Sequence, residues 1–206
     1  MRTRLVAAGA ALTLLAGCSA GPAARRLPDF ALINQSGQVV RAEDLRGRAA
    51  VISFIFTTCH DVCPLVTAQL ARTQADARAA GLGAAVRFVS ITVDPNTDTP
   101  AVLQRYAARF EADMRTWDFL TGPPDEVARV LRAMRVFAEV EGGRLGHATV
   151  VLLVSPRGEV VQRYTDVDRL HVRILDGLRR LEARGRGYNP GDRQDHPGIG
   201  GRHGRS

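Results

Sequence analysis

The feature that most constrains the fold is a continuous apolar run, "AAVISFIFTT" at residues 49–58, which leads directly into two cysteines. β-Branched and aromatic side chains dominate the run, and polar residues do not alternate with apolar ones along it. This pattern is typical of a strand buried on both faces of a sheet that helices cover. A second run, "AAVRFVSITVD" at residues 84–94, repeats it. The chain is therefore expected to fold around a central sheet with at least two buried strands.

Segments with helical composition alternate with these strands. A helix behind Pro64 is expected to end at Gly81, and a second is expected to begin with Thr99 as N-cap and Pro100 behind it. The remaining expected elements are two short strands within residues 30–45, a strand at 117–122, a helix at 123–137, a hairpin at 147–165 and a closing helix at 166–185. This order predicts an α/β fold. A cysteine pair at a strand-to-helix junction further predicts a thioredoxin-like sheet flanked by helices, with an N-terminal hairpin extension.

The first residues do not belong to this pattern. Arg2 and Arg4 precede the apolar stretch "LVAAGAALTLLA", which is too short to span a membrane and has the form of a secretory signal. The sequence "LAGC" that follows resembles the lipobox of bacterial lipoproteins, which implies cleavage before Cys18 and a lipid on its sulfur. The alternative is an ordinary signal peptide with an incidental cysteine.

Four segments follow from these observations. Residues 1–17 are interpreted as a lipoprotein signal peptide, 18–27 as a membrane tether, 28–184 as one thioredoxin-like domain, and 185–206 as a disordered tail rich in Gly, Arg and His. The domain is expected to work outside the cytoplasm, held by lipid at the periplasmic face of a bacterial membrane, where disulfides can persist.

The net charge of +7 comes from a chain in which every basic residue is arginine. These arginines are spread along the sequence and do not cluster on an aromatic-rich element. No nucleic-acid partner is therefore predicted. A basic exported domain favours anionic lipid or an acidic partner, although a solvated basic surface explains the same composition.

Cys59 and Cys63, in "FTTCHDVCPL", allow three interpretations: a redox pair, a structural disulfide, or part of a metal site. A thiol at a helix N-terminus ionises more easily, and the thiolate both attacks disulfides and binds metals. Cysteines four positions apart lie on one face of a helical turn. A disulfide closing so small a loop would give little entropic stabilisation. Thioredoxin-type redox pairs have two intervening residues, whereas this pair has three.

Two thiolates are soft ligands that select copper(I), zinc or iron–sulfur clusters, and a metal site needs a further ligand. The candidates are His60, Asp61, His147, His171, His196 and His203. We favour His147, which we expect to begin the strand "HATVVLLV" beside the cysteines. We expect His171 to lie on the surface of the last helix. His196 and His203 fall in the expected tail.

Four stretches resemble the Sco/SenC family of copper proteins that assemble cytochrome c oxidase: "FTTCHDVCP", "VSITVDPNTDTP", "WDFLTG" and "GHATVVLLVSPRG". The resemblance covers roughly residues 28–182. It implies a thioredoxin-like domain that holds one copper ion, Cu(I) or Cu(II), on Cys59, Cys63 and His147. It further implies delivery of copper to the binuclear copper centre of oxidase subunit II, with another periplasmic copper donor as a second partner.

The resemblance leaves an enzymatic alternative open, a thiol–disulfide oxidoreductase that uses Cys59 and Cys63 to reduce the cysteines of that centre or of other exported proteins. A peroxide-reducing protein of the same fold is disfavoured, because Phe56 stands where such enzymes place threonine. The chain also departs from the family pattern at two positions. Gly146 replaces an aspartate before the histidine, and His60 follows the first cysteine.

Local chemistry gives simpler roles to four other residues of the motifs. Asp61 is expected to cap the helix that carries Cys63, while Asp94 and Asp98 are expected to serve turn and helix-start geometry. Trp117 is expected to be part of the core.

Overall fold

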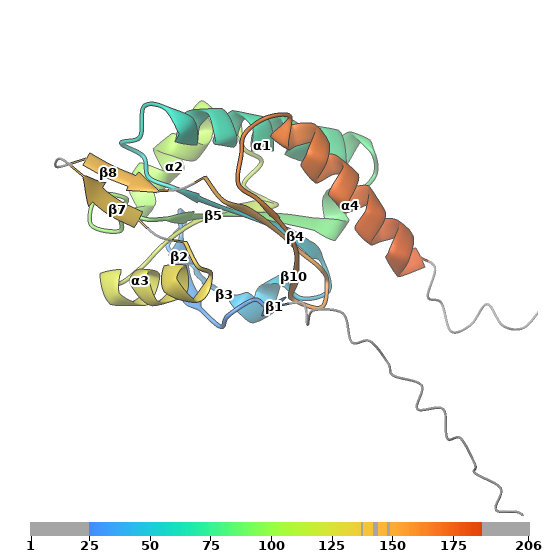
Figure 1. Cartoon of the computed structure of the whole chain (residues 1–206), viewed down its shortest axis with the longest axis horizontal. Helices are drawn as coiled ribbons and strands as arrows, with labels where there is room; N and C mark the ends of the chain where they lie inside the picture. Colours follow the sequence, from blue (N-terminus) through green and yellow to red (C-terminus); the bar gives the residue numbers. More distant parts are fainter. Residues whose placement is uncertain (1–24, 137, 142–143, 148, 187–206) are drawn as a thin grey trace, which may run out of the picture.

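The computed structural model describes residues 25–136, 138–141, 144–147 and 149–186 (Figure 1). Its strands are β1 (Arg25–Arg26), β2 (Ala31–Asn34), β3 (Val39–Arg41), β4 (Ala49–Ile55), β5 (Val86–Thr92), β6 (Trp117–Thr121), β7 (Ala138–Glu141), β8 (Arg144–His147), β9 (Val151–Val154) and β10 (Glu159–Tyr164). Its helices are α1 (Val62–Ala79), α2 (Pro100–Arg109), α3 (Pro124–Ala133) and α4 (Leu170–Arg186), with short 3-10 helices at Ala42–Leu45 and Gly83–Ala85. Within these ranges, eight strands form one sheet in the order β1-β10-β9-β4-β5-β6-β2-β3, and β7 and β8 form a separate ribbon.

The centre of the sheet confirms the predicted α/β architecture. β4, β5 and β6 run parallel, β9 lies antiparallel to β4, and all seven residues of β4 are buried. The hydroxyl groups of Ser53 and Ser90 lie 2.8 Å apart, and the indole Nε1 of Trp117 donates to Ser90 Oγ at 3.0 Å. These bonds satisfy the polar atoms of the apolar strands, and they place Trp117 in the core, as predicted.

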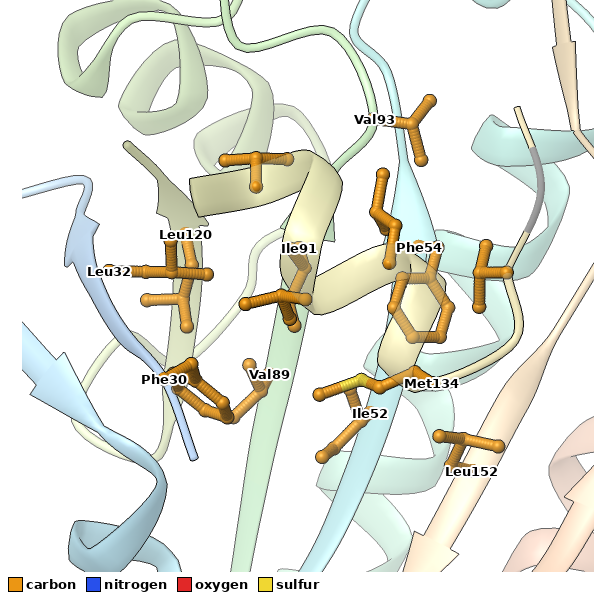
Figure 2. Close-up of a cluster of buried hydrophobic side chains, with 14 of the residues drawn as sticks. Phe30, Leu32, Ile52, Phe54, Val89, Ile91, Val93, Leu120, Met134 and Leu152 are labelled. Atoms are coloured by element: carbon orange, nitrogen blue, oxygen red, sulfur yellow. The ribbon is translucent and has the colours of Figure 1, made fainter. Parts of the chain in front are cut away.

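Two hydrophobic clusters lie on opposite faces of the sheet. Helices α1, α2 and α4 cover one face and α3 covers the other (Figure 1). Because side chains alternate along a strand, neighbouring residues of β4 enter different clusters: Val51 packs under α1 and α4, whereas Ile52 and Phe54 pack under α3. Figure 2 shows the cluster under α3, in which Met134 at the end of α3 lies near Ile52 and Phe54.

The expected helix boundaries at Gly81 and Thr99 are confirmed. Gly81 follows the end of α1 with φ of 77°, a left-handed conformation that glycine adopts without strain. Thr99 caps α2 by accepting a hydrogen bond from the amide of Val102, and Pro100 occupies the first turn. Asp61 occupies the N-cap position of α1, but its side chain makes no capping hydrogen bond, so the capping prediction is wrong. Its φ and ψ of −118° and −93° differ from the extended backbone from which a capping side chain ordinarily reaches back.

The expected strand at 147–154 is also wrong in its first half. His147 is the last residue of β8, which pairs with β7 in the ribbon, and β9 begins only at Val151. The described residues of this segment thus pair with each other before the chain enters the main sheet.

The ends of the folded region extend further than expected. Arg25 and Arg26 form β1 and pair with β10, inside the segment that we interpreted as a tether, and α4 continues to Arg186. The expected N-terminal hairpin is present as β2 and β3, and β2 joins it to the main sheet through β6. The signal peptide, Cys18 and most of the expected tail lie outside the described residues. None of the described helices has the length and apolar character needed to cross a membrane.

Candidate metal centre

Cys59 and Cys63 lie where β4 passes into α1. The amide of Cys59 donates to the carbonyl of Phe56 at 3.2 Å, which closes a turn directly after the strand. The amide of Cys63, in the first turn of α1, points at Cys59 Sγ at 3.4 Å. The sulfur of Cys59 thus receives one of the amide groups that a helix start leaves without an intrahelical partner.

The two thiols differ in exposure. Cys59 is half-buried, whereas Cys63 is 1% exposed and packs into the hydrophobic cluster under α3. Burial raises the pKa of the Cys63 thiol to about 12, and the nearby Cys59 and Asp98 add to this rise, which a backbone hydrogen bond from Phe56 partly offsets. Both side chains are thiols here rather than halves of a disulfide. The pair therefore consists of one sulfur that solvent reaches and one held inside the fold.

Asp98 fixes the loop that carries Cys59. Its carboxylate accepts hydrogen bonds from the Thr57 amide at 3.1 Å and the Thr57 hydroxyl at 2.5 Å. The hydroxyl of Thr92, at the end of β5, donates to the same carboxylate at 2.5 Å. Asp98 is fully buried, and burial raises its pKa although these hydrogen bonds counteract the rise. Its expected role in local turn chemistry was therefore incomplete, because the side chain bonds to a loop distant in sequence. Asp94 does form the expected turn, since its carbonyl accepts from the amides of Thr97 and Asp98.

Two further residues that the sequence did not indicate support the first turn of α1. The hydroxyl of Thr67 donates to the carbonyl of Cys63 at 2.8 Å and lies 2.9 Å from the hydroxyl of Tyr106 on α2. Burial raises the pKa of Tyr106, and the neighbouring cysteines add to this effect. The four-residue spacing of Cys63 and Thr67 could have indicated the contact between them. No local sequence signal indicates that Tyr106 on α2 is the partner of Thr67.

The backbone brings His147 towards the same end of the sheet. The first residue of β9, Val151, pairs with Ser53 near the end of β4, and the chain reaches Val151 only four residues after His147. Four residues span at most about 14 Å, so the Cα atoms of His147 and Val151 lie no further apart than this. The His147 side chain lies outside the described atoms, so its assignment as a ligand stays a prediction.

The other predicted candidates are placed as follows. His60 and Asp61 are exposed on the loop. His171 was expected on the surface, but its side chain is only 12% exposed and its Nε2 lies 2.7 Å from Asp76 Oδ2 on α1. This prediction is wrong because α4 packs on α1, and the pair joins the two helices. His196 and His203 lie outside the described residues. Among the side chains that the structure does describe, no three His, Cys, Asp or Glu residues form a metal-binding group.

Comparisons with known proteins agree with this geometry. The SCO1/SenC family model matches residues 19–181. A SCO1/SenC family lipoprotein from Bacillus anthracis has a solved structure that is 29% identical, with a TM-score of 0.72 over 79% of this chain and 98% of its own. ScoI from Arabidopsis thaliana, solved with copper bound, is 30% identical, with a TM-score of 0.66 over 76% of this chain and 99% of its own. BsSco, described as a cytochrome c oxidase assembly protein with a disulfide switch, is 30% identical, with a TM-score of 0.69 over 79% of this chain and 96% of its own.

The donor atoms fit the copper that is bound in the Arabidopsis ScoI structure. The two thiols at the start of α1 are soft donors of the kind that copper(I) prefers, and the sequence has a histidine four residues before β9. The fold is the thioredoxin-like fold of the solved Sco structures. With the family model spanning most of the sequence, the chain belongs to the SCO1/SenC family.

Proposed function

We propose that this protein binds one copper ion through Cys59, Cys63 and His147 and delivers it to the binuclear copper centre of cytochrome c oxidase subunit II. The observation that carries the proposal is the placement of both thiols at the start of α1, with the Cys63 amide donating to Cys59 Sγ. Membership of a family with copper-bound and oxidase-assembly members supports it.

The unequal burial of the thiols gives copper transfer an order. Copper is the cargo, and a receiving thiolate must displace the protein's ligands one at a time. Cys59 is half-buried and lies on a loop, whereas Cys63 is enclosed by core side chains. An incoming thiolate therefore replaces Cys59 first, and Cys63 is the last sulfur to release the ion.

We further propose that Cys18 carries a lipid that holds the domain at the outer face of the cell's membrane. The apolar stretch that ends in "LAGC" and a lipoprotein of the same family in Bacillus anthracis support this placement. Intact mass of the protein purified from membranes tests it. A Cys18→Ser variant that keeps the wild-type mass shift and membrane fraction would overturn the anchor.

Copper binding is tested by adding Cu(I) anaerobically to reduced protein in the presence of a competing chelator. Wild-type protein is expected to retain one copper, and Cys59→Ser and His147→Ala are expected to lose it. His60→Ala is the matched control, because it removes an exposed imidazole directly beside Cys59. Copper retained in His147→Ala but lost in His60→Ala would contradict the ligand set.

A thiol–disulfide oxidoreductase is the second candidate, and the pairing of an accessible with a buried sulfur favours it. The Cys59 thiolate would attack a partner disulfide to form a mixed disulfide, and Cys63 would then attack Cys59 and release the partner as a dithiol. The resulting Cys59–Cys63 disulfide would need an external thiol donor for the next cycle. His147→Ala separates the two functions, because it removes a copper ligand and leaves both thiols. Reductase activity that disappears with copper binding in this variant would argue against an independent reductase role.

A further inference from the structure

A cavity of about 240 Å³ lies on the α3 side of the sheet, and neither Cys59 nor Cys63 lines it. Its apolar lining comes from Pro28, Ala133, Met134, Leu152 and Val160. Figure 2 shows Met134 and Leu152 side by side at the edge of the hydrophobic cluster. The cavity therefore gives a ligand access to apolar surface that continues into the core.

Three arginines, Arg26, Arg135 and Arg163, also line the cavity, and no carboxylate of a described residue belongs to the lining. Among the described residues, none of the three forms an ion pair. Glu159 lies opposite Arg26 in the β1–β10 register but does not line the cavity. The cavity therefore combines an apolar floor with three arginines that form no ion pair with a described residue.

Backbone carbonyls hold one of these guanidinium groups in place, that of Arg163. Arg163 donates to the carbonyls of Met134 and Arg135 at 3.0 and 2.7 Å, so it is fixed at the end of α3. Burial lowers the pKa of Arg163, and the charge of Arg135 adds to this effect. Arg135 has φ of 55°, a left-handed conformation that favours glycine at the residue after a helix. An arginine side chain thus occupies a position where the backbone would be more stable without it.

The position of the cavity in the chain bears on what fills it. Arg26 lies in β1, where the described fold begins. Residues 19–24 separate β1 from Cys18, and this connection can extend to at most about 25 Å. If Cys18 carries the proposed lipid, the cavity stays within that distance of a membrane. Arginine binds phosphate through paired N–H groups, and acyl chains match an apolar floor.

We propose that this cavity binds an anionic phospholipid, with the headgroup phosphate on Arg26, Arg135 and Arg163 and the start of an acyl chain over Met134 and Leu152. The complex orients the domain on the membrane and does not depend on copper. The inference draws on the proposed lipid anchor only for the proximity of the membrane.

Vesicle flotation tests the proposal with a chain that begins at residue 19, which keeps every element of the described fold and carries no lipid. Binding to vesicles of equal parts phosphatidylglycerol and phosphatidylcholine is compared with binding to phosphatidylcholine alone. Arg26→Gln and Arg135→Gly are each expected to weaken binding to the anionic vesicles about fivefold. Arg105→Gln removes the same charge from an exposed position on α2 and is expected to change binding less than twofold.

Arg135→Gly also excludes destabilisation as the reason for weaker binding. Glycine relieves the left-handed backbone, so this variant is expected to keep or raise the thermal unfolding temperature. Equal loss of binding in Arg105→Gln and the cavity variants would overturn the proposal in favour of general charge attraction. Wild-type protein that does not bind anionic vesicles would also overturn the proposal. If inorganic phosphate alone then binds at the cavity, the arginines would be assigned to a soluble anion. Because the assay uses neither copper nor the Cys18 lipid, its failure leaves the copper proposal and the anchor untouched.

Discussion

Asp98 and Thr57 are joined by a two-point hydrogen-bonded contact, in which one buried carboxylate accepts from both the amide and the hydroxyl of the threonine. Thr57 stands two residues before Cys59, and Asp98 stands two residues before α2. The contact therefore fixes the cysteine loop to the start of a helix that contributes no sulfur ligand.

Asp98→Ala is expected to lower the free energy of unfolding by about 2 kcal/mol, because it leaves the Thr57 amide and the Thr92 hydroxyl without their acceptor. Thr57→Val keeps the amide and is expected to cost about half as much. Urea unfolding monitored by Trp117 fluorescence measures both. Asp94→Ala is the control, since the bonds of Asp94 in the turn use its backbone. An equal loss of unfolding free energy in Asp94→Ala would show that the Asp94–Asp98 segment stabilises the fold only through its turn.

Alkylation is expected to distinguish the two thiols. At pH 8, iodoacetamide should modify Cys59 much faster than Cys63, because Cys63 is 1% exposed and burial raises its pKa. Quenched time points analysed by peptide mass spectrometry give the two rates. Denatured protein serves as the reference, in which both rates should become similar. Equal rates in the native protein would contradict the burial of Cys63.

The raised pKa of Cys63 also predicts a pH dependence of stability. The folded protein holds the Cys63 proton more tightly than the unfolded chain, so this group contributes stability that is complete below its ordinary pKa of 9.0. That contribution is lost as the pH rises from about 9 towards about 12. Unfolding free energies at pH 8 and pH 10.5 should therefore fall more steeply for wild type than for Cys63→Ala. The raised pKa of Tyr106 acts in the same direction in both proteins, so the difference between them reports the Cys63 thiol together with its effect on Tyr106.

Gly177 is expected to resist substitution although it lies inside α4. A Cβ atom there would meet Leu153 Cδ2 at 2.6 Å and the Tyr164 hydroxyl at 2.9 Å. Gly177→Ala should therefore destabilise the fold by about 1–3 kcal/mol, because the helix must move away from the sheet. Gly185→Ala is the matched control in the same helix, where the added Cβ meets open space and alanine should stabilise by up to about 1 kcal/mol. Thermal unfolding of both variants shows whether packing or helix propensity determines the effect of alanine at Gly177.

The His171–Asp76 pair is expected to serve structure alone. His171→Ala should lower the free energy of unfolding by about 1 kcal/mol, because it removes a contact between α1 and α4. Copper stoichiometry should remain at the wild-type value. Loss of copper in a folded His171→Ala protein would mean that this histidine, and not His147, completes the metal site.

The elements that sequence predicts best are those whose signals are local. The buried strands β4 and β5 follow from continuous apolar runs, and the boundaries at Gly81 and Thr99 follow from turn and capping chemistry. The placement of Cys59 and Cys63 follows from the junction between strand and helix. Each of these depends on neighbours within a few positions of the chain.

The features that escaped prediction depend on distant partners or on short segments. Asp98 looked like a turn residue because its partner Thr57 lies 41 positions earlier. His171 looked like a surface residue because its partner lies on another helix. β1 has only two residues, both arginine, and its pairing with β10 leaves no pattern in the sequence. The ribbon that ends at His147 was hidden because its two strands are short.

The distance in sequence between Thr57 and Asp98 has a consequence for a chain that emerges progressively from a ribosome or a translocation channel. Cys59 and Cys63 appear first, and the carboxylate that anchors their loop follows only after all of α1 and β5. Until then both thiols belong to an unanchored segment, open to oxidants and to stray metal ions. The loop that carries both thiols can therefore reach its anchored, native geometry only after β5 and Asp98 have been synthesised.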